Sequence, residues 1–181
     1  VLNGRIRPDT FAYLFVSLGI ACPLMIKNSL FSGKSAGAGE IGHTIMQLDG
    51  PKCDMCGKRG CLDSLASDSA ILKHCRNAME TGGAQVLKSY VDASGQLTMK
   101  EVVQAQQTGD PVVRAVVMQA IQYLAIELAN VINFMSPEQV VVDAYVMRLA
   151  ENRDAFMHTV REYLFGINDT QVSVEFKDFD P

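Results

Sequence analysis

Short apolar runs separated by turn residues fill the first part of the chain. The run "FAYLFVSL" at residues 11–18 is rich in aromatic residues and is bounded by Pro8 and Gly19, which predicts a buried strand. "CPLMIKN" follows almost at once, and Asn28-Ser29 is typical of a turn, so a hairpin is the simplest arrangement. After a loop rich in glycine, serine and alanine, residues 45–48 predict one more short strand.

The spacing of apolar positions becomes helical from Cys61 onward. It continues for about twenty residues, and a Gly-Gly pair at 82–83 predicts the end of that helix. Thr98, followed three residues later by Glu101, has the pattern of a capping box, in which the hydroxyl accepts from a backbone N–H while the carboxylate reaches back. A helix is therefore expected from Thr98 to about residue 107.

The longest helix is expected from Asp110 to residue 134. Asp110 is a favourable N-cap, and the proline that follows it suits the first helical turn. One face of this helix is apolar and consists of Val113, Val117, Ala120, Ile121, Leu124, Leu128, Val131 and Ile132. The core of the domain explains that face, which is the preferred interpretation of the helix taken alone, although its other alanines, glutamines and valines could meet a second subunit.

The last part of the chain alternates strand, helix and strand. "QVVVDA" at residues 139–144 is β-branched and predicts a buried strand, residues 148–165 predict a helix that ends at Gly166, and "QVSVEF" at residues 171–176 alternates like a strand. Strands and helices are thus mixed, with a strand–helix–strand unit near the C-terminus, which indicates an α/β fold.

Composition narrows the class of protein. The chain has 181 residues, of which 48% are apolar and 20% charged, as in a globular domain or one lobe of a larger molecule. No apolar run is expected to span a membrane. The start "VLNGRIRPDT" has neither a secretion signal pattern nor an initiator Met, so the chain is expected to be a fragment. With a net charge of −4 and no basic run, it is a poor DNA binder by itself, and any DNA-binding segment would lie outside it.

The five cysteines do not resemble a disulfide framework. Their number is odd, three of them lie within nine residues, and no signal peptide precedes them; they are Cys22, Cys53, Cys56, Cys61 and Cys75. A reducing, cytoplasmic setting fits this pattern better.

The clustered cysteines predict a structural zinc site. Cys53-x2-Cys56-x4-Cys61 offers three thiolates on a short loop, and Gly57 and Gly60 would let the backbone turn tightly enough for the sulfurs to converge. Three unligated buried cysteines in so polar a loop would be unusual. His43 is the nearest imidazole and the expected fourth ligand; the competing imidazoles, each in a predicted helix, are His74 and His158. A Cys3His set leaves no open position for water, so the metal would hold His43 in one tautomer and let its second ring nitrogen face a ligand.

This stretch resembles the signature of the ROK family, which groups sugar kinases with sugar-responsive repressors. The similarity lies in "AGEIGH", a Gly-Pro-x-Cys, a second cysteine, "CGKRGC" and an acidic residue, and it extends to "LFSGKSAGAGEIGH" and to "LANVINFMSPEQVVVD". It covers about residues 11–176. The family usually has Cys-x-Cys where this chain has Cys-x2-Cys.

The resemblance implies an α/β lobe of the actin-like ATPase and ribonuclease H-like kind, with a zinc-binding loop at residues 39–63. The whole chain, 1–181, would be the C-terminal lobe. The first lobe, with its phosphate loop, its sugar-binding Asn-Asp pair and its catalytic base, would lie outside, as would the helix-turn-helix of the repressors. Carried over residue by residue, the sugar contacts are Glu40, His43 and Asp63, with Asp63 where the family usually has Glu. The zinc ligands carried over are His43, Cys53, Cys56 and Cys61.

Two segments favour a sensor over a kinase. The family's kinases resemble one another in a Gly-Thr-Gly-Ile-Gly loop, where this chain has "SLGIACP" at residues 17–23. Backbone N–H groups approach phosphate closely only where the residues are small, and Pro23 also lacks an N–H. The kinases have a Gly-Gly pair beside adenosine, where this chain has Asp143-Ala144, and a carboxylate near phosphates is unfavourable. We therefore expect weak or absent ATP binding and no catalytic residue.

These observations predict the sugar-binding effector domain of a ROK-type repressor, with structural zinc, a small sugar as effector and contact with DNA only through another segment. Family members are often dimers or tetramers, so a homo-oligomer is expected. Two alternatives remain open: a sugar kinase with a divergent nucleotide loop, and a zinc-stabilised domain that binds a partner protein and no sugar.

Overall fold

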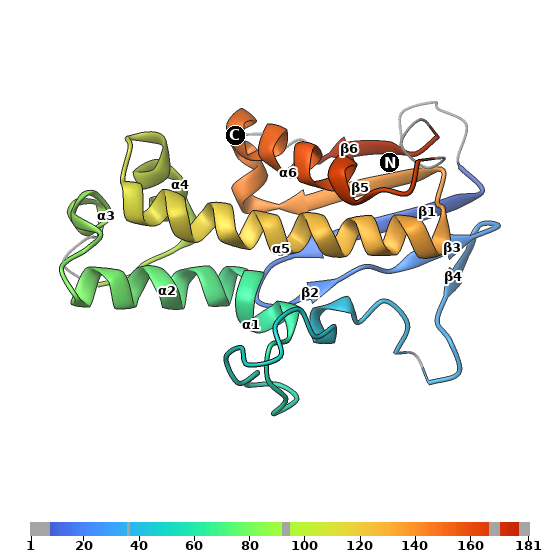
Figure 1. The fold of residues 1–181 in the computed structure, drawn as a ribbon, viewed down its shortest axis with the longest axis horizontal. Coiled ribbons are helices and arrows are strands. Elements are labelled where there is room, and N and C mark those ends of the chain that lie inside the picture. Colours follow the sequence, from blue (N-terminus) through green and yellow to red (C-terminus); the bar gives the residue numbers. More distant parts are fainter. Residues whose placement is uncertain (1–7, 36, 92–94, 167–170, 178–181) are drawn as a thin grey trace.

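A mixed six-stranded sheet forms the centre of the computed structural model, which describes residues 8–35, 37–91, 95–166 and 171–177 (Figure 1). The strands are β1 (Thr10–Val16), β2 (Ile20–Ala21), β3 (Leu24–Ile26), β4 (Ser29–Phe31), β5 (Gln139–Ala144) and β6 (Ser173–Phe176). Their order is β4-β3-β1-β5-β6, and β2 pairs with β1. The pairs β1–β5 and β5–β6 are parallel, and the others are antiparallel. The predicted hairpin is confirmed, but its turn lies at Lys27 and Asn28, both of which have positive φ, one residue before the predicted Asn28-Ser29, and Ser29 begins β4.

Helices connect β4 to β5 and β5 to β6. They are α1 (Leu62–Ala66), α2 (Asp68–Glu80), α3 (Gln85–Tyr90), α4 (Met99–Gln107), α5 (Pro111–Met135) and α6 (Ala150–Tyr163), with 3-10 turns η1 (Ile41–His43) and η2 (Tyr145–Arg148). Figure 1 shows α5 and α6 crossing in front of the sheet, α2 running along α5, and the segment that contains the cysteines projecting below. The side chains of Ala12, Leu14 and Val16 on β1 are buried in the same core as Val140 and Val142 on β5.

Local capping chemistry predicted two helix starts correctly. Thr98 and Glu101 form the capping box at the head of α4. The Asp110 carboxylate accepts from the backbone N–H groups of Val112 and Val113 and so caps α5. Its second oxygen accepts from Leu87 N, which ties α3 to the same point.

Three predicted elements differ from the observed ones. The helix expected from Cys61 onward is broken at Ser67, whose hydroxyl donates to Asp63 O and accepts from Ala70 N, so it closes α1 and caps α2. The strand expected at residues 45–48 is only an isolated bridge between Ile45 and Cys61, because its neighbours bond to loop residues. The helix expected from residue 148 begins at Ala150 after η2, and α3 was not predicted.

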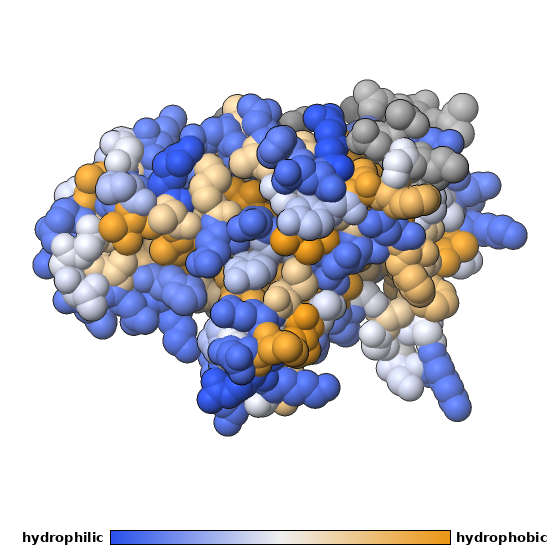
Figure 2. Space-filling view, in the orientation of Figure 1, coloured by the Kyte–Doolittle hydropathy of each residue, from blue (hydrophilic) through white to orange (hydrophobic). Residues whose placement is uncertain are grey.

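Helix α5 is long and apolar enough to cross a membrane by length and composition, contrary to the expectation that no run would be. Half of its most apolar stretch is buried inside the lobe, with Val117, Leu124 and Leu128 fully covered. It packs against α6, α1 and α2, so it is the core helix of this domain. Hydrophilic side chains are spread over the face shown in Figure 2 and interrupt its apolar groups.

Candidate metal centre and ligand site

A tight loop presents the three clustered cysteines. Cys53 N donates to Lys58 O at 2.7 Å, Gly57 N donates to Cys53 O at 2.9 Å, and a bridge between Lys52 and Arg59 closes the base of the loop. The additional residue of the Cys-x2-Cys spacing is accommodated in this turn. Gly60, at φ +72°, is required there, because a Cβ on it would lie 1.5 Å from Gln47 O.

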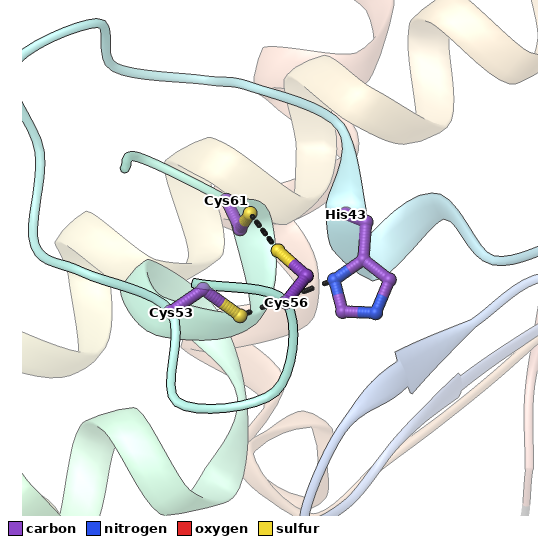
Figure 3. A group of neighbouring side chains, drawn as sticks. All are labelled: His43, Cys53, Cys56 and Cys61. Atoms are coloured by element: carbon purple, nitrogen blue, oxygen red, sulfur yellow. Dashed lines mark hydrogen bonds between the residues drawn. The ribbon is translucent and has the colours of Figure 1, made fainter. Parts of the chain in front are cut away.

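His43 and the three cysteines converge on one point. The ligand atoms of His43, Cys53, Cys56 and Cys61 all lie within 4.8 Å of one another. Cys53 Sγ is 4.0 Å from His43 Nδ1, and Cys56 Sγ is 3.4 Å from Cys61 Sγ (Figure 3). All five cysteines are free thiols, as expected without a disulfide framework. The competing imidazoles, which lie exposed on α2 and α6 and outside this cluster, are His74 and His158.

The cluster has the ligand chemistry and nearly the size of a zinc site. Tetrahedral coordination at the usual Zn–S and Zn–N lengths separates two sulfurs by about 3.8 Å and a sulfur from a nitrogen by about 3.6 Å. The separations of 3.4 Å between Cys56 and Cys61 and 4.0 Å between Cys53 and His43 differ from these by a few tenths of an ångström, and all ligand atoms lie within 4.8 Å of one another. A hydrogen bond from Lys58 N lowers the pKa of the Cys56 thiol, which favours the thiolate. Burial raises the pKa of Cys61 to about 12, and a thiol of this kind ionises at neutral pH when it coordinates a cation. The residues therefore fit a soft metal ion, because thiolates and an imidazole are ligands that such ions, zinc among them, prefer.

The second nitrogen of His43 is directed away from the metal cluster. Nδ1 is the nitrogen nearest the cysteines, and Figure 3 shows Nε2 on the far side of the ring from the three sulfurs. Glu40 is the N-terminal flanking residue of η1, the same short turn that ends at His43, and its side chain is exposed and makes no capping hydrogen bond. The imidazole of His43 and the carboxylate of Glu40 thus come from the two ends of one short turn.

Asp63 is close to the same histidine but already holds the backbone. Its Oδ1 accepts from Ile20 N at 2.8 Å, while its Oδ2 lies 3.9 Å from His43 Nδ1. Gly42 makes this approach possible, because a Cβ there would be 2.1 Å from Asp63 Oδ1 and 2.6 Å from Ile20 O. One carboxylate oxygen is therefore occupied by the start of β2. The shorter Asp side chain serves at least a structural purpose, and its sugar contact stays a prediction.

The polar groups of the turn at residues 17–23 form hydrogen bonds within the lobe. Its hydrogen bonds run from Ser17 N to Gly19 O, from Ile20 N to Asp63 Oδ1, from Cys22 N to Gly39 O, from Asp68 N to Ser17 O and from Ser69 Oγ to Leu18 O. Three N–H groups that could otherwise meet an anion therefore have partners within the lobe, and Pro23 has none to give. These three N–H groups are therefore not free donors for a phosphate in this structure.

Two carboxylates, those of Asp143 and Asp68, lie near this turn, at the end of the sheet where the chain leaves β1 and β5. Asp143 Oδ2 accepts from the Tyr13 hydroxyl at 2.6 Å and from Lys177 Nζ at 2.7 Å. Burial, followed by the bond to Asp143, raises the pKa of Tyr13. Asp68, at the first position of α2, has a buried Oδ1 with no hydrogen-bond partner among the described residues. Burial and then the charge of Asp143 raise the pKa of Asp68 to about 6.

Replacing Asp68 with asparagine is expected to stabilise the lobe near neutral pH. Because the folded-state pKa lies above the ordinary 3.8, ionisation of Asp68 disfavours the folded state. This penalty is absent below about pH 3.8 and complete above about pH 6. Asp68→Asn should raise the free energy of unfolding by about 1–2 kcal/mol at pH 7.5, after allowance for solvent screening, and by much less at pH 4.5. Urea unfolding at both pH values, with exposed Asp154→Asn as control, measures the difference; an equal effect at both would contradict it.

Some residues of this region were not identified from the sequence. Tyr13 and Lys177 lie far from Asp143 along the chain, and only the sheet register brings them together. Glu127 falls within the buried face of α5 and accepts from the Thr44 hydroxyl at 3.0 Å. The only sign of this in the sequence was that Glu127 directly precedes Leu128 of the apolar face. A glutamate at such a position is ordinarily interpreted as part of the polar border of a helix.

The chain is similar in sequence to the proteins of one family. The sequence model of the ROK family matches residues 2–179. The chain is 31% identical over 130 residues to a xylose repressor of Caldicellulosiruptor bescii, covering 72% of this chain and 32% of that protein. It is 30% identical over 134 residues to a glucokinase of Halalkalibacterium halodurans, covering 74% of this chain and 40% of that protein. The chain thus spans about a third of the length of the curated relatives that it matches.

Solved structures share the fold. A ROK hexokinase from Thermus thermophilus superposes with a TM-score of 0.74 at 26% identity, over 93% of this chain and 52% of that one. A ROK family transcriptional regulator, a homologue of the Escherichia coli MLC protein, superposes with a TM-score of 0.78 at 20% identity, over 95% of this chain and 42% of that one. Kinases and regulators match to a similar degree, so the fold does not separate the two activities.

Proposed function

Because the chain belongs to the ROK family, we propose that it is the sugar-binding effector lobe of a transcriptional regulator and that it carries a structural zinc ion. The observation that carries the proposal is the convergence of His43 with three cysteines, with Glu40 on the same short turn. By its name, the xylose repressor responds to a sugar and the glucokinase acts on one. Similarity to both relatives supports a sugar as the ligand.

His43, Cys53, Cys56 and Cys61 would hold the zinc, which when bound fixes the tautomer and the orientation of the imidazole. His43 then offers Nε2 to a sugar hydroxyl. The Glu40 carboxylate accepts hydrogen bonds from neighbouring hydroxyls. Asp63 is a third, weaker contact in this proposal, because its Oδ2 lies 3.9 Å from Nδ1, on the metal side of the ring. These roles position a ligand and require no bond to be made or broken.

The absence of kinase activity is part of the same proposal. Three N–H groups of the turn at residues 17–23 are bonded within the lobe, and two carboxylates, Asp68 and Asp143, lie at the adjacent sheet edge. Both features disfavour the binding of a nucleoside triphosphate. Binding of sugar would instead shift the lobes or the subunits, and a DNA-binding segment outside this chain would respond. Free thiols suit a reducing, cytoplasmic setting, and a dimer or tetramer is the expected assembly.

Titration calorimetry tests the sugar and nucleotide parts together. We expect the full-length protein to bind at least one of D-xylose, D-glucose and their N-acetylated amino relatives, and to bind ATP no better than about millimolar, because nothing in the turn cradles phosphate. Tight ATP binding, or phosphate transfer to any of these sugars, would instead support a sugar kinase, the alternative favoured by the similarity to glucokinase. Binding of neither ligand would favour a protein-interaction domain.

A further inference from the structure

Helix α5 buries a carboxylate that the proposed function does not use. Glu127 is 5% exposed and lies among the covered side chains of Leu124 and Leu128. Its two oxygens accept from the Thr44 hydroxyl at 3.0 Å and from the Asn130 amide at 3.4 Å. No cation lies within ion-pair distance of it in the described part of the chain. Burial raises the pKa of Glu127, so placing a charged carboxylate here costs free energy.

The partner of Glu127 stands at a junction of the candidate site. Thr44 directly follows His43 and ends η1. Its hydroxyl donates to Glu127 on α5, and its carbonyl accepts from Leu62 N at 2.9 Å, beside the cysteine ligand Cys61. Thr44 therefore connects three parts of the lobe: His43, the residue that follows Cys61, and helix α5.

The other end of the same segment is also fixed. Cys22 N donates to Gly39 O at 2.7 Å, so residues 39–44 are anchored at both ends. The negative charge of Glu127 also contributes, after burial, to the raised pKa of Cys22. Glu40 and His43 lie between them. Ile41 is the one apolar side chain of this short segment and packs against the core, and the hydrogen bonds at Gly39 and Thr44 fix the two ends.

We infer that Glu127 is a positioning residue that holds the segment of Glu40 and His43 through Thr44 and couples that segment to helix α5. A leucine at this position would fill the core without the cost of a buried carboxylate, so stability alone does not account for Glu127. Its purpose is to give α5 one directional bond to the turn that faces the ligand. A ligand that moves the turn must then stretch this bond or move α5 with it. The ligand role rests on the proposed function, whereas the positioning of the segment does not.

Amide hydrogen exchange of the full-length protein, without added ligand, tests the positioning. Thr44→Val and Glu127→Leu each remove the bond, and we expect exchange in residues 39–48 to rise about tenfold in both. The double variant should rise no further, because both changes remove the same bond. Thr44→Ser and Glu127→Gln keep a donor and an acceptor and should stay within about twofold of the wild type. Glu127→Leu should not lower Tm, so faster local exchange cannot be attributed to general destabilisation.

Val117→Ala is the matched control, because it opens a cavity in the distant half of the same helix. It should lower Tm and leave exchange in residues 39–48 unchanged. In a second readout, zinc affinity measured by competition with a chromophoric chelator should fall on the order of tenfold in Thr44→Val and not in Thr44→Ser. Unchanged exchange in both Thr44→Val and Glu127→Leu would overturn the inference. Failure of the wild type to bind zinc or sugar would contradict the proposed function, and the exchange data would still decide the role of Glu127.

Discussion

Replacing Cys61 with alanine is expected to lower the free energy of unfolding by about 4 kcal/mol, which for a domain of this size lowers Tm by about 8–16 °C. Cys61 is fully buried, and its sulfur belongs to the four-atom cluster with His43. A three-ligand site binds zinc much more weakly, and the free energy of binding is also free energy of folding, because the unfolded chain does not preform the site. Differential scanning calorimetry with metal analysis by mass spectrometry measures both losses.

Cys75→Ala provides the matched control. Cys75 is also a fully buried thiol, but it lies on α2 and outside the cluster. Its replacement leaves a small cavity, so we expect a loss of about 1 kcal/mol with the zinc content unchanged. A strong chelator should lower the Tm of the wild type and of Cys75→Ala but not lower that of Cys61→Ala further. Equal melting of the two variants, with or without chelator, would count against a structural metal.

The features predicted correctly from the sequence are those set by neighbouring residues. Thr98 with Glu101, and Asp110 with the proline after it, cap helices through groups within three residues, so the sequence pattern is nearly sufficient. The convergence of the three cysteines was predictable for the same reason. They lie within nine residues of one another, and the glycines between them let the loop turn tightly enough to bring the sulfurs together. His43 was predictable by proximity and by the family resemblance.

The features that were missed depend on distant contacts or on one competing side chain. Apolar spacing continues through Ser67, and only its bonds to Asp63 and Ala70 show why α1 ends there. The group of Asp143 and Lys177 depends on sheet register, which one sequence does not reveal. Asp63 illustrates a further case: its position in the motif predicted a sugar contact, whereas one of its oxygens is bonded to the backbone of β2. A residue in a functional motif can thus also support the fold.

Replacing Glu40 with glutamine is expected to weaken sugar binding by about 10–100-fold, because a hydrogen bond to a charged group contributes about 1.5–3 kcal/mol and the neutral amide retains part of it. Glu40 is exposed and makes no capping bond, so Tm and zinc content should stay at wild-type values. The variant therefore separates ligand contact from folding. Calorimetric titration with D-xylose and D-glucose, each against the full-length protein, measures the change in affinity.

Glu80→Gln is the control for the loss of one surface charge, since Glu80 is exposed at the far end of α2. It should leave sugar affinity unchanged. His43 cannot serve in the same way, because its replacement would remove a metal ligand and a ligand contact together. If Glu40→Gln binds sugar as tightly as the wild type, the turn that presents Glu40 does not face the ligand, and the sugar site must lie elsewhere in the family fold. If the affinity falls while Tm and zinc content hold, the Glu40 carboxylate acts on the ligand directly and is needed neither for the metal nor for the fold.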